Sequence, residues 1–129
     1  MYYYICTDSV KELNEIKPHD TESVLRFLGG NGNLYGFDYA VYMVEQILED
    51  PKLLTLITKQ LYPETAIRFD VTVKSVERNL RTLIQRCWKN ANPQAWEEIS
   101  GRKIQVPPTN GEFLDLVVGY LRNSSGKNT

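Results

Sequence analysis

The sequence predicts an all-α fold in a single domain, and two observations carry this prediction. Apolar residues recur every three or four positions through much of the chain, as they do along the buried face of a helix. Helix-start signals, threonines or prolines, stand just before these periodic stretches. A length of 129 residues suffices for one domain with a real core, and the 42% hydrophobic and 24% charged fractions exclude a largely disordered chain.

The first half of the chain predicts four helices. An amphipathic stretch is stopped by Pro18, and Thr21 is expected to be the N-cap of the second helix. The glycine-rich segment Gly29–Asn33 reads as a turn that ends this second helix, and Pro51 opens the fourth. The expected helical ranges are 9–17, 21–29, 36–49 and 53–60.

The second half predicts three more helices. Pro63 begins a short one, and after the turn Asp70-Val71 the side chain of Thr72 is a natural N-cap for a longer one. Thr109 followed three residues later by Glu112 has the form of a capping box ahead of the last helix. The expected ranges are 64–69, 73–90 and 110 to about 122, with a small strand or extended arm at 104–106.

Charge is distributed unevenly along the chain, although the formal net charge is only −1. Residues 1–57 carry four basic and nine acidic side chains, a net charge of −5. Residues 58–90 carry seven basic and three acidic side chains, a net charge of +4, and residues 91–129 are neutral. Because a ligand responds to charge within about 8–10 Å at physiological salt, the middle segment can attract an anion that the whole molecule does not.

Several kinds of site are absent from the sequence pattern. Cys6 and Cys87 are too few for a disulfide framework, and no signal peptide is recognisable, which favours a cytoplasmic location. His19 is the single histidine, so no metal site is expected. The Gly29–Asn33 segment lacks the lysine of a phosphate-binding loop. We therefore expect no catalytic residues, no metal and no cofactor, and the chain is not expected to be an enzyme.

The predicted helix 73–90 is the most informative element. Its apolar side is expected to face the core and consists of Val76, Leu80, Leu83, Ile84 and Cys87. Its opposite side is polar and basic and consists of Lys74, Arg78, Arg81, Thr82 and Gln85, with Ser75 and Glu77 at the edges. A short helix, a tight turn and a longer helix with such an outward face are typical of a helix-turn-helix. The alternative is an ordinary solvated helix face.

Several separated motifs occur in the order and at the spacing of one known family. They are Gly36-Phe37-Asp38-Tyr39, Ile57-Thr58-Lys59-Gln60-Leu61-Tyr62-Pro63, Ala66 with Phe69, Ser75-Val76-Glu77-Arg78 with Arg81, Cys87-Trp88 and Pro108-Thr109-Asn110-Gly111-Glu112-Phe113-Leu114. With these motifs, the chain from about Thr21 to Arg122 resembles the C-terminal DNA-binding domains of the sporulation initiation response regulator, stage zero sporulation protein A, of endospore-forming bacteria.

The resemblance implies a compact bundle of about six helices with a helix-turn-helix that reads short promoter boxes. The recognition helix of the family carries the pattern Val-Glu-Arg-x-x-Arg, which here begins at Val76. By residue-by-residue transfer, Glu77, Arg78 and Arg81 are expected to read bases, while Val76 packs in the core. Flanking or phosphate contacts are expected from Lys59, Lys74, Ser75, Thr82, Gln85 and Lys89. The matching pair Tyr62-Pro63 is expected to be structural, with Tyr62 packed behind the helix start.

The chain also departs from the family pattern. Ser75 stands where the family has an arginine, and Thr82 stands where it usually has a histidine, so the affinity or the preferred box should differ. The segment Ser100–Lys103 replaces a Phe-Gly-Tyr segment that the family links to polymerase contacts, which weakens an expectation of activator function. The receiver domain of the family cannot be accommodated in the first 20 residues.

The expected organisation is an N-terminal arm or short extension over 1–20, a helix-turn-helix DNA-binding domain over 21–122 and a disordered tail over 123–129. The expected function is sequence-specific binding of double-stranded promoter DNA by a transcription regulator that lacks the receiver domain. Two further interactions are expected, a homodimer on tandem sites and a contact with RNA polymerase. No membrane association is expected. The alternative is a protein-interaction module that keeps the fold and modulates a full-length regulator without reading DNA.

Overall fold

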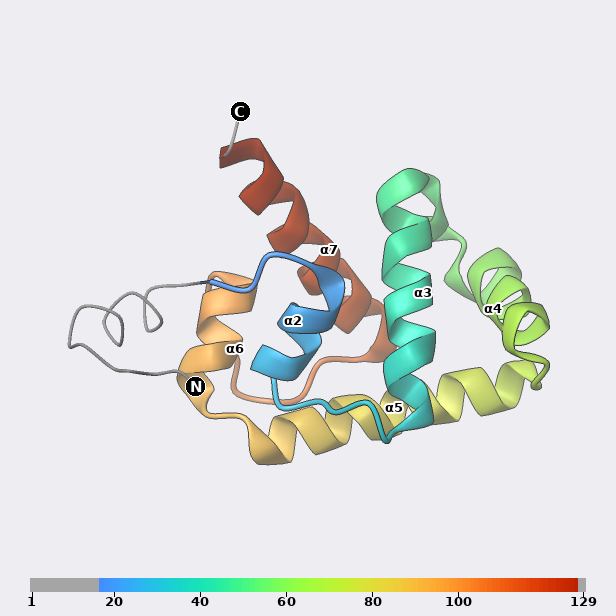
Figure 1. The fold of residues 1–129 in the computed structure, drawn as a ribbon, viewed down its shortest axis with the longest axis horizontal. Helices are drawn as coiled ribbons and strands as arrows, with labels where there is room; N and C mark the ends of the chain where they lie inside the picture. Colours follow the sequence, from blue (N-terminus) through green and yellow to red (C-terminus); the bar gives the residue numbers. More distant parts are fainter. Residues whose placement is uncertain (1–16, 128–129) are drawn as a thin grey trace, which may run out of the picture.

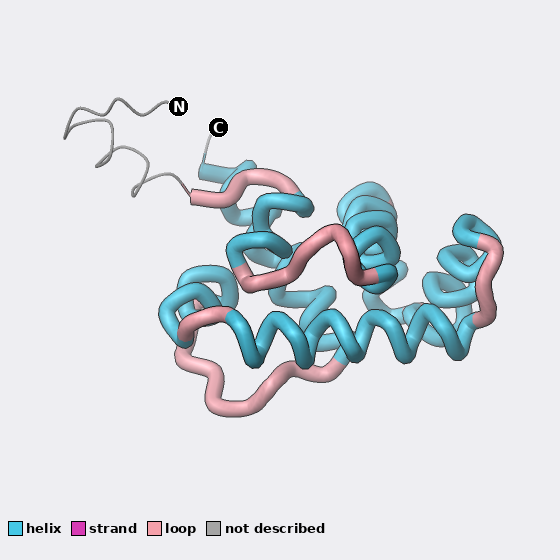
Figure 2. Tube along the Cα trace, turned by 60° about the horizontal axis from the view of Figure 1, so that its bottom comes forward, coloured by secondary structure: helices cyan, strands magenta, loops and turns pink. Residues whose placement is uncertain are grey.

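The computed structural model describes residues 17–127, and within that range it contains helices and no strand (Figure 2). The α-helices of this part of the chain are α2 (Thr21–Phe27), α3 (Tyr35–Glu49), α4 (Tyr62–Phe69), α5 (Val73–Asn90), α6 (Pro93–Ser100) and α7 (Asn110–Lys127). The predicted all-α bundle of about six helices is confirmed. The helix predicted over 9–17 and most of the predicted arm over 1–20 lie outside the described residues.

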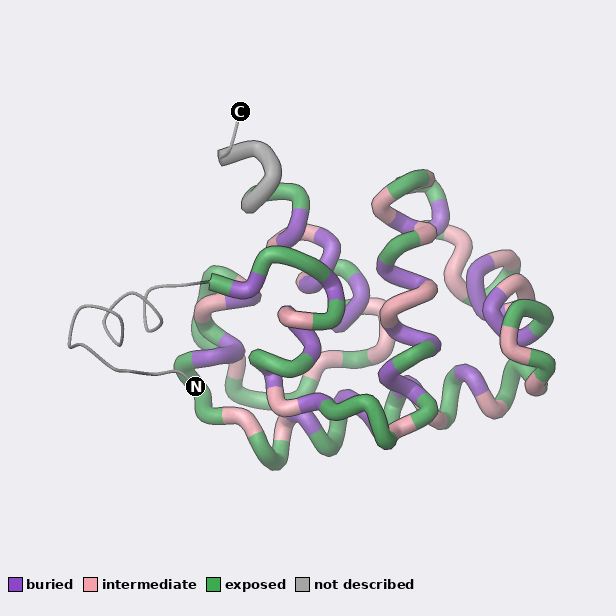
Figure 3. Tube along the Cα trace, in the orientation of Figure 1, coloured by how far each residue is buried: buried purple, intermediate pink, exposed green. Residues whose placement is uncertain are grey.

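Helices α3, α4 and α7 pack on α5. Figure 1 shows it along the lower edge of the molecule, with α3 rising from it, α4 beside its N-terminal part and α6 beyond its C-terminal end. It contacts α3, α4 and α7, and α7 in turn contacts α3 and α6. Each of these helices carries buried positions (Figure 3). The largest fully buried side chains are Trp96, Phe113, Leu25, Leu28, Met43, Ile47, Leu61, Leu80, Leu83 and Ile84.

The start of α3 approaches α5 so closely that only glycine fits there. A Cβ atom on Gly36 would meet the backbone carbonyl of Asn79, whose carbon would lie 2.8 Å away, and the Cβ atom of Leu83 at 3.1 Å. The backbone of α5 cannot move aside as the end of a flexible side chain could. The glycine is therefore what allows α3 and α5 to pack at this distance.

Helix α2 begins at a different cap from the one predicted. Asp20, and not Thr21, is the N-cap: its carboxylate accepts a hydrogen bond from the Ser23 backbone N–H at 2.8 Å. The Ser23 hydroxyl oxygen accepts one from the Asp20 N–H at 3.0 Å, which completes a capping box. Hydrogen bonding to Ser23 lowers the pKa of Asp20. Thr21 is buried instead, and its hydroxyl donates to a Glu45 carboxylate oxygen of α3 at 2.6 Å.

The helix predicted over 53–60 is replaced by two irregular turns. They are η1, a 3₁₀-helix over Pro51–Thr55, and η2, a π-helical turn over Ile57–Leu61. Leu56 between them has φ −126° and ψ 34°, which interrupts a regular α-helix. Leu53 and Leu61 are both buried. The two turns replace the expected α-helix and keep both leucines in the core.

Helix α6 was not among the predicted helices. Asn92 is its N-cap and accepts a hydrogen bond from the Ala95 N–H at 2.8 Å, and Pro93 occupies the first turn. The helix buries Trp96 and Ile99. The pair Asn92-Pro93 was therefore a helix-start signal that was overlooked. Residues 104–106, predicted to form a small strand or extended arm, form an irregular segment in the structure.

Helix α7 begins where it was predicted to begin and ends later. Thr109 and Glu112 form the expected capping box: the Thr109 N–H donates to the Glu112 carboxylate at 2.9 Å, and the Glu112 N–H donates to the Thr109 hydroxyl oxygen at 3.2 Å. The helix continues to Lys127, beyond the boundary predicted after Arg122. The sequence after Arg122 contains no proline, so every residue there can donate a helical hydrogen bond.

Candidate nucleic-acid interface

Helices α4 and α5 form the predicted helix-turn-helix, joined by a turn at Asp70, Val71 and Thr72. Asp70 adopts the left-handed conformation (φ 56°, ψ 51°), which ends α4 and reverses the chain. The Val71 N–H donates to the Ala66 carbonyl at 2.9 Å and the Asp70 N–H to the Ile67 carbonyl at 3.3 Å, so the turn supplies partners for two of the last carbonyls of α4. The predicted bounds of the second helix, 73–90, and its N-cap Thr72 are confirmed.

Replacing Thr72 by alanine is expected to lower the free energy of unfolding by about 1 kcal/mol. The Thr72 hydroxyl oxygen accepts a hydrogen bond from the Ser75 N–H at 3.0 Å, and alanine leaves that donor at the start of α5 without its partner. Urea denaturation measures the change, with Thr72→Ser as the matched variant because serine keeps the accepting hydroxyl. Equal stability of Thr72→Ala and Thr72→Ser would contradict a role for the cap.

The two sides of α5 differ as the periodicity predicted. The predicted core positions Val76, Leu80, Leu83, Ile84 and Cys87 are all buried. The predicted DNA-facing positions Lys74, Glu77, Arg78, Arg81, Thr82 and Gln85 are all exposed. A helix that is buried along one stripe and open along the other can enter a DNA groove without losing its packing.

The three predicted base-reading residues lie within little more than one turn of α5. Glu77 and Arg81 are four residues apart and form an ion pair, with a nitrogen–oxygen distance of 3.8 Å and side chains about half exposed. An exposed pair of this kind contributes little to stability, so it can be exchanged for contacts with a ligand. Within residues 17–127 no ion pair involves Arg78. Its guanidinium fork is therefore available to an external acceptor.

The residues predicted to flank the site are more scattered. Lys74 and Lys89 are exposed at opposite ends of α5, about 22 Å apart along the axis at the rise of an α-helix. Lys59 is exposed but lies on η2, outside the recognition helix. Ser75 is partly buried, and its hydroxyl oxygen accepts a hydrogen bond from the Asn79 side chain at 3.1 Å. The structure thus groups Lys74 with the predicted base-reading residues and separates Lys59 and Lys89 from them.

A cavity of about 470 Å³ lies beside the site, between α5 and the segment that leads into α7. Glu77, Arg81 and Gln85 line its α5 side, and Pro107 to Gly111 line the other. Asn110 crosses between the two: its side-chain amide donates to the Tyr62 hydroxyl and to the Glu77 backbone carbonyl, each at 3.1 Å. Sequence reasoning recognised the capping box around Asn110 but not this contact, because Glu77 is 33 positions away.

Tyr62 has the structural role predicted for it. The residue is buried at the start of α4, with 4% of its surface exposed. Burial raises the pKa of its phenol, and the hydrogen bond from Asn110 opposes this effect. The phenol therefore stays protonated at neutral pH, and its hydrogen bond with Asn110 connects α4 to α7.

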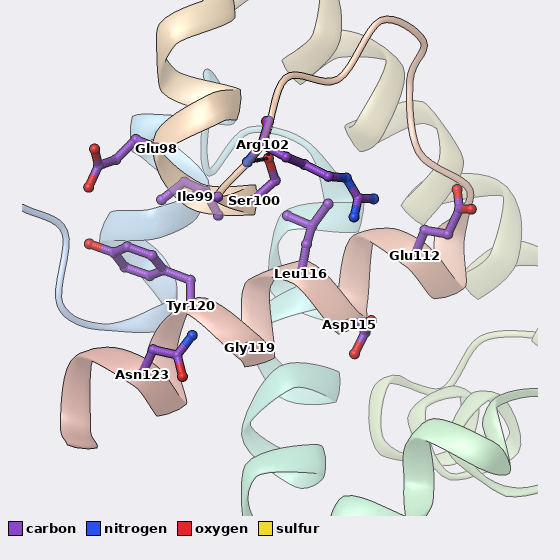
Figure 4. A pocket seen from close by; sticks show the side chains of 11 residues that line it. Glu98, Ile99, Ser100, Arg102, Glu112, Asp115, Leu116, Gly119, Tyr120 and Asn123 are labelled. Carbon is purple, nitrogen blue, oxygen red and sulfur yellow. Dashed lines mark hydrogen bonds between the residues drawn. The ribbon is translucent and has the colours of Figure 1, made fainter. Parts of the chain in front are cut away.

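A second cavity, of about 420 Å³, lies between the end of α6 and the outer side of α7 (Figure 4). It contains the tight turn at Gly101 (φ +80°), in which the Ser100 hydroxyl donates to the Arg102 carbonyl at 2.7 Å. Arg102 shares the lining with the carboxylates of Glu98, Glu112 and Asp115. The segment Ser100–Lys103, which departs from the family pattern, thus lies at the end of α6 and just after it, outside the helix-turn-helix of α4 and α5.

The described residues offer no sign of other chemistry. Cys87 is buried, and burial raises the pKa of its thiol to about 12, so the thiol is neutral and not an activated nucleophile. No group of three or more potential metal-ligating side chains occurs between residues 17 and 127. None of the helices in this range combines the length and the apolar composition that a membrane crossing requires.

A comparison with protein families agrees with this geometry. The family model described as the C-terminal part of the sporulation initiation factor Spo0A matches residues 21–121, a range that includes all six α-helices of the described chain except the end of α7.

Proposed function

Since the chain belongs to the Spo0A C-terminal family, whose domains are DNA-binding regulators of sporulation initiation, we propose that it recognises short promoter boxes in double-stranded DNA. The observation that carries this proposal is the outward side of α5. On it an arginine without an ion pair among the described residues, Arg78, stands next to the weakly paired Glu77 and Arg81.

In the proposed mechanism, α5 enters the major groove with its buried stripe still packed on the domain. Arg78 and Arg81 donate to the O6 and N7 acceptors of guanines, and Glu77 accepts from the amino group of cytosine. The ion pair between Glu77 and Arg81 opens as each side chain finds its base. Lys74 at the start of α5 binds a phosphate, and Thr82 and Gln85 contact the flanking backbone or bases.

The surrounding residues belong to the same proposal. Lys59 and Lys89 lie away from the base-reading group, so we assign them phosphate contacts at the edges of the footprint. We propose that the DNA-binding unit spans residues 21–122, which the family match over 21–121 supports. Pairing of two copies on tandem boxes and a contact with RNA polymerase are further parts of the proposed function.

Fluorescence anisotropy with labelled duplexes tests the proposal. A duplex that carries a sporulation-type promoter box should bind at least about a thousandfold more tightly than a scrambled duplex of equal length and composition. Because three lysines neutralise phosphates in the proposed complex, log K should fall against log salt concentration with a slope of about −3. Equal affinity for both duplexes would overturn specific reading.

Light scattering distinguishes the protein-interaction alternative in the same samples. A dimer that forms without DNA and shows no preference for the box would support an interaction module. A species that forms only when the box duplex is added supports the proposed regulator.

A further inference from the structure

Asn110 is the residue through which α7 reaches both helices of the helix-turn-helix. Its amide nitrogen donates to the Tyr62 hydroxyl of α4 and to the Glu77 carbonyl of α5, at 3.1 Å in each case. A carbonyl oxygen can only accept, so the Glu77 contact requires the NH₂ group of Asn110 on that side and determines the orientation of the amide. One side chain thereby connects three helices at the start of the outward side of α5.

The position of Asn110 is itself held firmly. It is the first residue of α7, directly after Thr109, whose capping box with Glu112 closes the helix end through two hydrogen bonds. On the other side, its partner Tyr62 is buried at the start of α4. The Asn110 amide therefore has a fixed position, in hydrogen-bond contact with the second turn of α5.

The contact of Asn110 with α5 lies beside a cavity and not inside the packed core. The cavity of about 470 Å³ separates α5 from residues 107–111, and the Asn110 amide bridges it next to Glu77. Among the described residues, the side-chain hydrogen bonds between α7 and the helix-turn-helix are the two that Asn110 donates. Asn110 is therefore the side chain that ties the turn carrying Glu77 to α7, in addition to the packing of α5 on α3 and α4.

We propose that Asn110 is a positioning residue for DNA reading: by bridging Tyr62 and the Glu77 carbonyl, it holds α5 at the angle at which Glu77 and Arg81 meet their bases. The inference rests on the proposed function, and it adds that a residue outside the helix-turn-helix sets its specificity. Loss of the bridge lets the start of α5 tilt, which weakens the angle-dependent base contacts more than the phosphate contacts.

Asn110→Asp is the decisive variant. Aspartate has nearly the same shape and is favourable at a helix N-terminus, so α7 should still form, but aspartate cannot donate to the Glu77 carbonyl. The ratio of box to scrambled affinity should fall by about fivefold, the factor that corresponds to one typical intramolecular hydrogen bond. The added negative charge weakens binding to both duplexes alike and cancels in this ratio.

Tyr62→Phe is the matched second variant, because it removes the other end of the bridge without a change of charge and at a buried position that DNA cannot touch. We expect the specificity ratio to fall in the same direction, and the double variant to lose less than the product of the two single losses. An unchanged ratio in Tyr62→Phe together with a reduced ratio in Asn110→Asp would mean that Asn110 contacts DNA directly, and would overturn a positioning role.

A measurement without DNA separates this inference from the proposed function. Amide hydrogen exchange in residues 76–81 should accelerate by about fivefold in Asn110→Asp, while exchange in residues 113–118 of α7 stays at the wild-type rate. Unchanged exchange in residues 76–81 would overturn the proposed role of the bridge, whatever the ratio of box to scrambled affinity. If the wild-type protein shows no preference for the box but exchange accelerates as expected, the proposed function fails and the bridge stands.

Discussion

Replacing Gly36 by alanine should lower the free energy of unfolding by about 3 kcal/mol, the upper range for forcing an extra methyl group into a packed interior. The new Cβ atom would collide with the Asn79 carbonyl group and press on the Leu83 Cβ atom at 3.1 Å. Relief requires α3 to move away from α5, which opens a helix pair in the centre of the core. Urea denaturation followed by circular dichroism measures the loss.

Gly119→Ala is the matched control for this substitution. Gly119 also lies within a helix, α7, but nothing stands within 4 Å of the position that its Cβ atom would take. Alanine is the better helix former, so this variant should gain about 0.5–1 kcal/mol. Opposite changes in the free energy of unfolding for the two variants would show that the close approach of α3 to α5, and not the loss of a glycine as such, destabilises Gly36→Ala. A wild-type stability of Gly36→Ala would contradict the packing described here.

Replacing Arg78 by alanine should weaken binding to the promoter box by about 1–3 kcal/mol, or about 5- to 150-fold in Kd. The proposed bidentate contact to guanine is lost, and no other side chain of α5 occupies that position. Binding to scrambled DNA should weaken far less, because it depends on phosphate contacts. Stability should stay near the wild-type value, since Arg78 is exposed and takes part in no ion pair within residues 17–127. Anisotropy titrations with both duplexes measure the two affinities.

Arg122→Ala removes the same charge at a distant place and serves as the control. Arg122 is exposed on α7, whose C-terminal end lies far from α5 (Figure 1). Its removal should change both affinities by a similar small factor that salt screens. If Arg78→Ala and Arg122→Ala change the two affinities by the same factors, the loss in Arg78→Ala is an effect of net charge, and the proposed base contact is refuted.

The parts of the fold that short-range patterns encode were predicted from the sequence. The bounds of α5, its cap at Thr72 and the capping box of Thr109 and Glu112 follow from residues within four positions of one another, and all were confirmed. The buried and exposed sides of α5 were confirmed for the same reason, since the helical repeat alone determines which side chains share a face. That the exposed side reads bases stays a prediction.

Predictions failed where a longer-range demand overrides the local pattern. Residues 53–60 have helical spacing, but the chain breaks at Leu56 into a 3₁₀ turn followed by a π turn, with Leu53 and Leu61 both buried. Thr21 is a good capping residue by type, yet it is buried against Glu45, and Asp20 caps the helix. Helix α6 was a missed local signal, since Asn92-Pro93 marks its start and Ala95, Trp96 and Ile99 form its buried face.

By itself, the sequence determined an all-helical domain with a helix-turn-helix whose second helix turns arginines outward, because caps and apolar periodicity act over a few residues. The tertiary structure alone decided that Gly36 lies against the backbone of α5 and that Asn110 joins Tyr62 to Glu77. These contacts connect residues tens of positions apart, and they exist only once whole helices have packed at particular distances and angles. No local pattern encodes such an approach, and it is this packing that orients the recognition helix.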